Sequence, residues 1–256
     1  MGGIADYFLL HDRDIARRVD DSIAAISAGR PRIIRRARGY APAPLALPDG
    51  FAAAAPVLAM GGELKAAFCL LRDGQAILSH HMGDLEHAKT FADYSRSLDD
   101  YLALFEHVPA AVAVDCYPEY LSTKHGRALA GQWQVAAVEV QHHHAHIAAC
   151  LAENGVALDD APLIGVALDG LGYGLDGTLW GGEFLLADYR DCQRLGTFKP
   201  VAMPGGAQAV REPWRNAYAH LMAEMGWARF AMDYADTPLH RFLHNKPRAA
   251  LDGMIA

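Results

Sequence analysis

The sequence lacks the features that mark secreted, membrane-embedded or nucleic-acid-coating proteins. No apolar run approaches the roughly 20 residues of a membrane-spanning helix, and the first residues lack the charged-then-apolar pattern of a secretory signal. The net charge of −7 disfavours broad nucleic-acid binding. Cysteines are few and scattered, with no Cys-x-x-Cys pair, at positions Cys69, Cys116, Cys150 and Cys192. We therefore expect a cytoplasmic protein with reduced thiols, of which Cys69 and Cys150 lie buried in apolar segments.

Apolar residues are abundant, at 52% of the 256 residues. That proportion is enough for a large buried core in one or two domains. The proline spacing of residues 41–56 is typical of an extended linker. We therefore predict a domain boundary near residue 50, with domains at residues 1–50 and 51–256.

The pattern after residue 50 alternates between strands and helices. Two apolar runs around Asp73-Gly74 predict a β-hairpin, and the acidic residues Asp84 and Glu86 predict the first turn of a helix that ends near Phe105. Further strands are predicted at 111–115, 135–140, 163–168 and 179–186, and helices at 121–132, 141–152 and 213–225. Residues 231–256 have no sheet pattern. The order β-β-α-β-α-β-α-β-β predicts an α/β fold in which an antiparallel hairpin joins a parallel sheet with helices on both faces.

The stretch from Val135 to Glu183 carries the chemistry. His142 and His146 are four residues apart, so they share one face of the predicted helix and can hold one divalent metal. Asp169 ends a predicted buried strand, where its carboxylate can join them as a third ligand. Two histidines and a carboxylate suit zinc or iron equally well. The glycine-dense loop at 170–178 lets backbone N–H groups approach a phosphate.

Two long motifs carry a family resemblance. The segment Val-Gln-His-His-His-Ala-His-Ile at 140–147 and the segment Ala-Leu-Asp-Gly-Leu-Gly-Tyr-Gly-Leu-Asp-Gly-Thr-Leu-Trp-Gly-Gly-Glu-Phe at 167–184 resemble the C-terminal domain of the HypF family of carbamoyltransferases. That domain is similar to the TsaD tRNA-modification proteins, which have the ASKHA (actin-like ATPase, ribonuclease-H-like) fold. The resemblance implies an ASKHA lobe with a mixed sheet in residues 51–256. Residues 1–50 resemble the tail of a YrdC-like domain.

The resemblance also implies binding residues beyond the three metal ligands. The residues implied for phosphate and nucleotide are Lys65, Gly170, Gly172, Gly182, Glu183, Gly205 and Gly206. Lys65 could equally be an exposed strand lysine, and Pro204-Gly205-Gly206 could be an ordinary turn. In the YrdC-like tail, Ser22, Arg36 and Arg38 match positions that line an adenylate pocket. The alternative for these arginines is a solvated strand face.

The resemblance implies a reaction and a partner. HypF proteins activate the carbamoyl group of carbamoyl phosphate with ATP, as carbamoyl adenylate, and transfer it to the C-terminal cysteine of HypE during NiFe hydrogenase maturation. No residue of this sequence presents itself as a general base. One alternative is a TsaD-like threonylcarbamoyl transferase for tRNA. The other is an inactive fragment that binds metal and nucleotide, since the family's later glycine-rich loop and later aspartate have no match here. We expect a chain incomplete at both ends and inactive alone.

Overall fold

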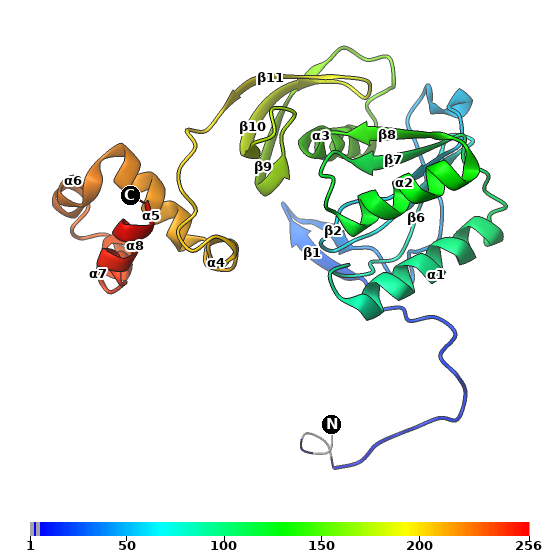
Figure 1. Cartoon of the computed structure of the whole chain (residues 1–256), viewed down its shortest axis with the longest axis horizontal. Helices are drawn as coiled ribbons and strands as arrows, with labels where there is room; N and C mark the ends of the chain where they lie inside the picture. The colour runs from blue at the N-terminus through cyan, green and yellow to red at the C-terminus, as the bar shows by residue number, and fades with distance from the viewer. Residues whose placement is uncertain (1–2, 4–5, 256) are drawn as a thin grey trace.

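The computed structural model describes residue 3 and residues 6–255, and its largest unit is a six-stranded mixed sheet in the order β3-β6-β5-β4-β7-β8 (Figure 1). The strands are β3 (Leu45–Ala46), β4 (Val57–Ala59), β5 (Cys69–Arg72), β6 (Gln75–Leu78), β7 (Ala111–Asp115) and β8 (Ala136–Val140). The neighbours β4, β7 and β8 run parallel, whereas β5 and β6 form an antiparallel hairpin. This is the mixed α/β sheet that the sequence predicts.

Helices α1 (Ala88–Leu104) and α2 (Leu121–Trp133) pack on this sheet, and α3 (His142–Glu153) follows its last strand. The core lies between the sheet and the helices, where Leu58 and Val112 pack with Tyr94 and Leu98 of α1 at 0% exposure. Burying such side chains contributes roughly 1.5–3 kcal/mol each. The sheet and its helices thus form a stable base for whatever lies at the strand ends.

Several predicted boundaries differ from the structure. The hairpin turn at Asp73-Gly74 is confirmed, and both residues have positive φ. The first of the two apolar runs that flank this turn, residues 57–71, is not one strand, because the chain leaves the sheet after Ala59 and returns at Cys69. Helix α1 begins at Ala88, so Asp84 is not in its first turn. Asp84 instead accepts a hydrogen bond from the backbone N–H of Lys65 at 2.9 Å, which ties the two irregular segments together.

A second, three-stranded antiparallel sheet follows α3. It has the order β11-β10-β9, with β9 (Leu163–Tyr173), β10 (Leu179–Ala187) and β11 (Cys192–Thr197). Ile147 and Leu151 of α3 pack against its inner face. Strand β9 extends five residues beyond the predicted end at Leu168, because it stays paired with β10 as far as Tyr173. The predicted glycine loop is therefore a short turn.

The four thiols are free, as expected from their scattered positions. The prediction that Cys150 is buried was wrong. Helix α3 turns Ile147 and Leu151 to the sheet and leaves Cys150 exposed.

The C-terminal helices form a separate group, joined to β11 by an extended segment (Figure 1). They are α4 (Ala207–Arg211), α5 (Trp214–Glu224), α6 (Gly226–Asp233), α7 (Pro238–His244) and α8 (Arg248–Ile255). Tyr218, Phe230, Leu243 and Leu251 form their core. The predicted helix at 213–225 is confirmed, and three further short helices, α6 to α8, follow it. No helix in the described part of the chain is long and apolar enough to cross a membrane.

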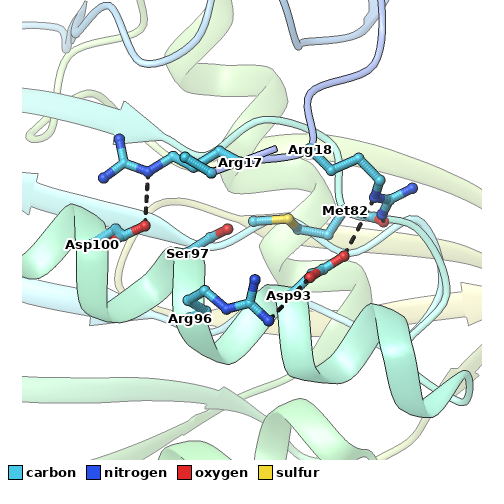
Figure 2. Close-up of a pocket in the computed structure, with 8 residues that line it drawn as sticks. Arg17, Arg18, Met82, Asp93, Arg96, Ser97 and Asp100 are labelled. Carbon is cyan, nitrogen blue, oxygen red and sulfur yellow. Dashed lines mark hydrogen bonds and ion pairs between the residues drawn. The ribbon is translucent and has the colours of Figure 1, made fainter. Parts of the chain in front are cut away.

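The N-terminal segment lies against the six-stranded unit. It contains the exposed hairpin of β1 (Ile23–Ser27) and β2 (Arg30–Arg35). Before the hairpin, Arg17 pairs with Asp100 of α1 at 2.7 Å, and Arg18 reaches both Asp93 and the Met82 carbonyl (Figure 2). The pocket between these side chains measures about 10 Å³, room for about one water molecule. We therefore assign it an anchoring role and no ligand.

The predicted linker is more ordered than an extended chain. Within residues 41–56 it contains β3 and the 3₁₀ helix η1 (Phe51–Ala53). The Phe51 ring packs edge-on against the Tyr189 ring, with the ring centroids 4.9 Å apart. The linker therefore connects the first sheet to the second instead of running free.

Candidate metal centre

Two of the proposed ligands lie in the first turns of α3. The helix begins after Gln141, whose side-chain oxygen accepts a hydrogen bond from the backbone N–H of His144 at 2.9 Å and so caps the helix. The helical repeat places the Nε2 atoms of His142 and His146 3.2 Å apart. The two imidazoles thus face one point in space.

Asp169 brings a carboxylate to the same point from the middle of β9. Its Oδ2 lies 3.1 Å from His142 Nε2 and 3.8 Å from His146 Nε2. Its Oδ1 accepts a hydrogen bond from the backbone N–H of Gly170 at 2.6 Å. One ligand atom from each of the three residues lies within 4.8 Å of the others. Two imidazole nitrogens and a carboxylate oxygen at this spacing fit a zinc or iron ion.

A fourth side chain, Asp115, was not predicted to belong to this site. It ends β7, and its Oδ2 lies 2.7 Å from His142 Nδ1. The Asp115 side chain is 8% exposed, so the contact is shielded from water. The sequence held one signal for it, an aspartate at the end of a predicted parallel strand, where the ends of neighbouring strands meet. A carboxylate behind a metal-binding histidine fixes its tautomer and orientation.

The charges at the centre are strongly coupled. The pKa of His142 is raised to about 9 by its side-chain hydrogen bonds, of which that with Asp115 contributes most and that with Asp169 next. The hydrogen bond with His142 lowers the pKa of Asp169 to about 2. The His142 imidazolium offsets one of the two carboxylate charges, and a divalent cation bound to His142 Nε2 would take the place of its proton.

The two histidines between the ligands have different surroundings. His143 is buried at 0% exposure, its ring lies roughly parallel to the Trp180 ring, and burial lowers its pKa. His144 donates its Nε2–H to the Asp188 carbonyl at 2.7 Å. His144 thereby connects α3 to the turn between β10 and β11.

Two of the five glycines predicted to bind phosphate lie against side-chain rings. A Cβ atom at Gly172 would be 2.4 Å from His143 Cε1, and one at Gly182 would be 2.1 Å from the Phe198 ring. A Cβ at Gly170 would meet nothing within 4 Å. Gly205 and Gly206 have positive φ in the turn before α4. In Gly172 and Gly182 the missing side chain therefore makes room for an aromatic ring.

Glu183 and Lys65 have contrasting environments. Glu183 is fully buried and forms a bidentate pair with Arg194, at 2.6 and 3.0 Å. Thr197 and the backbone N–H of Gly181 also donate to it, so its oxygens are already occupied. Lys65 is exposed and has a positive φ of 52°. Gly62, three residues before Lys65, lies beside the site, since a Cβ there would be 4.0 Å from His142 Cε1.

A cleft of about 870 Å³ borders Asp169. Asp169 and Gly170 line it from β9, Trp180 from β10, and Asn216 and His220 from α5. The cation position and the cleft therefore share the residue Asp169.

The residues predicted for an adenylate pocket bond within their own segment. Ser22 Oγ donates to the Arg38 carbonyl and accepts from the backbone N–H of Ala37. Arg36 donates to the carbonyls of Tyr40 and Ala43, and Arg38 pairs with Asp21. Their polar groups hold the base of the β1–β2 hairpin.

Two family models match most of the chain. Residues 52–153 match the HypF Kae1-like domain, and residues 165–254 match the second subdomain of the carbamoyltransferase Kae1-like domain. The fold and the site thus define the class, a Kae1-like domain with an ASKHA-type mixed sheet.

Relatives and solved structures narrow the class to a family. The carbamoyltransferase HypF of Rhodobacter capsulatus is 49% identical over 223 residues, which is 87% of this chain and 30% of the relative. HypF2 of Cupriavidus necator is 49% identical over 226 residues, 86% of this chain and 27% of the relative. The chain belongs to the HypF family of carbamoyltransferases, and it spans about 30% of the length of these relatives.

Crystal structures of the family share the fold. Full-length HypF in the phosphate- and nucleotide-bound form matches with a TM-score of 0.79 and 39% identity, over 99% of this chain and 32% of that one. T. kodakarensis HypF matches with a TM-score of 0.67 and 36% identity, over 80% of this chain and 26% of that one. At these identities the likeness extends to sequence as well as fold.

Proposed function

We propose that this chain forms the cation- and nucleotide-binding part of a carbamoyltransferase that passes a carbamoyl group from carbamoyl adenylate to the C-terminal cysteine of HypE. The observation that carries the proposal is the convergence of His142, His146 and Asp169 at the edge of the cleft. The division of the chain is part of the proposal. Residues 1–50 are the tail of a YrdC-like domain that makes the adenylate from carbamoyl phosphate and ATP, and residues 51–256 hold the transfer site.

In the transfer step, the thiolate sulfur bonds to the carbamoyl carbon while the bond from that carbon to the AMP phosphate oxygen breaks, and AMP leaves. A zinc or iron ion, when bound, supplies charge stabilisation at phosphate and carbonyl oxygens. His142, His146 and Asp169 would hold it, and Asp115 would keep the Nδ1–H tautomer of His142. The nucleotide would enter the cleft along Gly170.

The relatives support this reading over threonylcarbamoyl transfer. Those with 49% identity are named carbamoyltransferases, and the full-length HypF crystal structure is of a phosphate- and nucleotide-bound form. Asp169 belongs both to the cation position and to the lining of the cleft. This arrangement supports the binding of a ligand that carries both a phosphate and a transferable group.

Calorimetric titration of the purified chain with zinc tests the centre. We expect one zinc per chain, a loss of binding in Asp169→Asn and His146→Gln, and no change in His87→Gln, which alters an exposed histidine outside the site. ATP is then titrated into the zinc-loaded chain. A wild-type chain that binds no zinc, or variants that bind it unchanged, would contradict the proposal.

The transfer itself is tested by mass spectrometry. The chain, zinc, ATP and carbamoyl phosphate are incubated with a peptide that carries the HypE C-terminal cysteine, and full-length R. capsulatus HypF serves as the positive control. Because the chain spans about 30% of its relatives, we expect it to bind zinc and nucleotide and to leave the peptide unmodified. Carbamoylation by the full-length relative and by the chain alike would make the chain an enzyme in its own right.

A further inference from the structure

His143 follows the first proposed ligand in sequence and lies at the inner wall of the metal centre. It is fully buried, and its Nδ1 lies 3.1 Å from Gln141 Nε2. Its Nε2 has no hydrogen-bond partner among the described residues and lies 3.9 Å from Asp169 Oδ2. A buried nitrogen that faces a carboxylate without a bond to it requires an explanation.

The hydrogen bonds of Gln141 determine which nitrogen of His143 carries the proton. The Gln141 side-chain oxygen accepts from the backbone N–H of His144, and its nitrogen donates to the Tyr173 carbonyl at 3.2 Å. The NH₂ group of the amide therefore faces His143 Nδ1. An amide NH₂ can only donate, so Nδ1 is the acceptor and the proton of the neutral ring is on Nε2.

When a cation takes the place of the Nε2 proton of His142, the neighbouring histidines hold opposite tautomers. Asp115 accepts from His142 Nδ1 and leaves the His142 Nε2 lone pair for a cation. Gln141 donates to His143 Nδ1 and leaves the His143 Nε2–H for an acceptor. The acceptor it faces is the Asp169 carboxylate.

Packing keeps the His143 ring in this position. The ring lies at 23° to the Trp180 ring, with centroids 6.3 Å apart. On another side is the backbone of Gly172, where even a methyl group would come within 2.4 Å of His143 Cε1. A fixed ring directs its donor without further loss of side-chain freedom.

We propose that His143 is a positioning residue that donates its Nε2–H to Asp169 and holds that carboxylate in the orientation in which it binds the cation. The inference rests on the proposed metal centre. Once His142 and His146 give their lone pairs to the cation, His143 is the donor still facing Asp169 Oδ2, and a shift of roughly 1 Å closes the present gap to hydrogen-bond length. Ligating carboxylates are commonly hydrogen-bonded in this way.

The tautomer can be measured without metal. Long-range ¹H–¹⁵N correlation spectra of the ¹⁵N-labelled, metal-free chain distinguish the two neutral tautomers, and loss of the signal in His143→Gln assigns it. We expect His143 as the Nε2–H form in the wild type and a mixture of forms in Gln141→Met. An Nδ1–H form in the wild type would overturn the inference.

Zinc affinity separates hydrogen bonding from packing. His143→Leu fills the space without a donor, whereas the amide of His143→Gln retains an N–H near the Nε2 position. We expect His143→Leu to bind zinc about 10–100-fold more weakly, the usual effect of losing such a partner, and His143→Gln to recover most of the affinity. With cobalt(II) in place of zinc, the visible spectrum should change in His143→Leu and stay close to wild type in His143→Gln.

The outcomes distinguish this inference from the metal centre itself. Wild-type zinc affinity in both His143 variants, or an equal loss in both, overturns the positioning role and leaves the centre intact. A wild-type chain that binds no zinc overturns both. Thermal melting of the metal-free variants verifies folding. If His143→Leu does not fold, Gln141→Met decides, because it keeps the ring and removes the amide that selects its tautomer. Since Gln141 also caps α3, the melting of metal-free Gln141→Met measures the cost of losing the cap separately.

Discussion

The Nδ1 of His142 lies 2.7 Å from the Oδ2 of Asp115, although the two residues are 27 positions apart and come from a helix and a strand. The contact exists because β7 and β8 are parallel neighbours, so that Asp115 pairs with Val140, two residues before His142. It directs the other nitrogen of His142 toward Asp169 and the cation position. The carboxylate behind the ligand is thus a product of the sheet topology.

Replacing Asp115 with asparagine should lower zinc affinity about 10–100-fold. The amide has no charge, and its NH₂ group can face Nδ1 and favour the tautomer that places a proton on the metal-facing nitrogen. Calorimetric titration with zinc measures the change. Glu139→Gln on β8 is the matched control, since it removes one carboxylate of an exposed ion pair with Arg127. A loss of under threefold in Asp115→Asn would contradict the assignment.

The parts of the site that share one element could be predicted from sequence. Helical spacing alone puts His142 beside His146, and the structure brings Asp169 to them. Asp115 depends on which strands are neighbours, and one sequence does not specify such pairing. Gly172 was assigned to phosphate because glycine permits close backbone approach, and Gly182 was assigned from the family resemblance. The rings that need their space, His143 and Phe198, come from other segments.

In the fold, too, local features could be predicted from sequence, whereas features that depend on distant segments could not. The order of helices and strands follows from local periodicity, and the α/β class was predicted correctly. Strand β9 was predicted too short because the glycines after Asp169 are typical of a loop, whereas pairing with β10 keeps them extended. The three helices after residue 225 were missed, since each is no longer than eight residues and gives little periodic signal.

Arg194→Met should destabilise the protein through Glu183. The carboxylate is fully buried, and Arg194 meets both of its oxygens while its guanidinium lies 4.1 Å from the Trp180 ring centroid. Removing one partner of a buried ion pair leaves an uncompensated charge, which costs about 3 kcal/mol or more. Urea denaturation measures the loss. Adding Glu183→Gln should recover part of it, because a buried amide is less costly than a buried carboxylate.

Arg127→Met serves as the reference for this comparison. Its pair with Glu139 is exposed on both sides, and such pairs contribute about 0–1 kcal/mol. Equal effects of Arg127→Met and Arg194→Met would show that the Glu183 pair behaves like a surface contact, contrary to its burial.

His107 should make the protein less stable in mild acid. It is 6% exposed, and burial lowers its pKa, so the folded state keeps the ring neutral. Above about pH 6.5 neither state protonates it, and its effect on stability is nil. As the pH falls below that value, the unfolded chain binds a proton before the folded chain does, and the free energy of unfolding decreases.

Urea denaturation between about pH 7 and pH 5 measures this slope. His107→Gln should flatten it relative to wild type, whereas His87→Gln, which changes an exposed histidine, should leave it unaltered. Parallel slopes for wild type and His107→Gln would rule out His107 as a source of the acid sensitivity.

Gly172→Ala should abolish tight zinc binding, whereas Gly170→Ala, two residues away on the same strand, should preserve it. A Cβ at position 172 would lie 2.4 Å from His143 Cε1 and 3.0 Å from His142 Cδ2, so both rings must move. A Cβ at position 170 meets no atom within 4 Å, although Gly170 is next to Asp169 and equally a glycine in the motif. Zinc titration of both variants, together with thermal melting without metal, tests whether Gly172 is required to leave room for the histidine rings or for the backbone to approach a phosphate. If Gly170→Ala lost zinc while Gly172→Ala retained it, the histidine packing described here would be wrong.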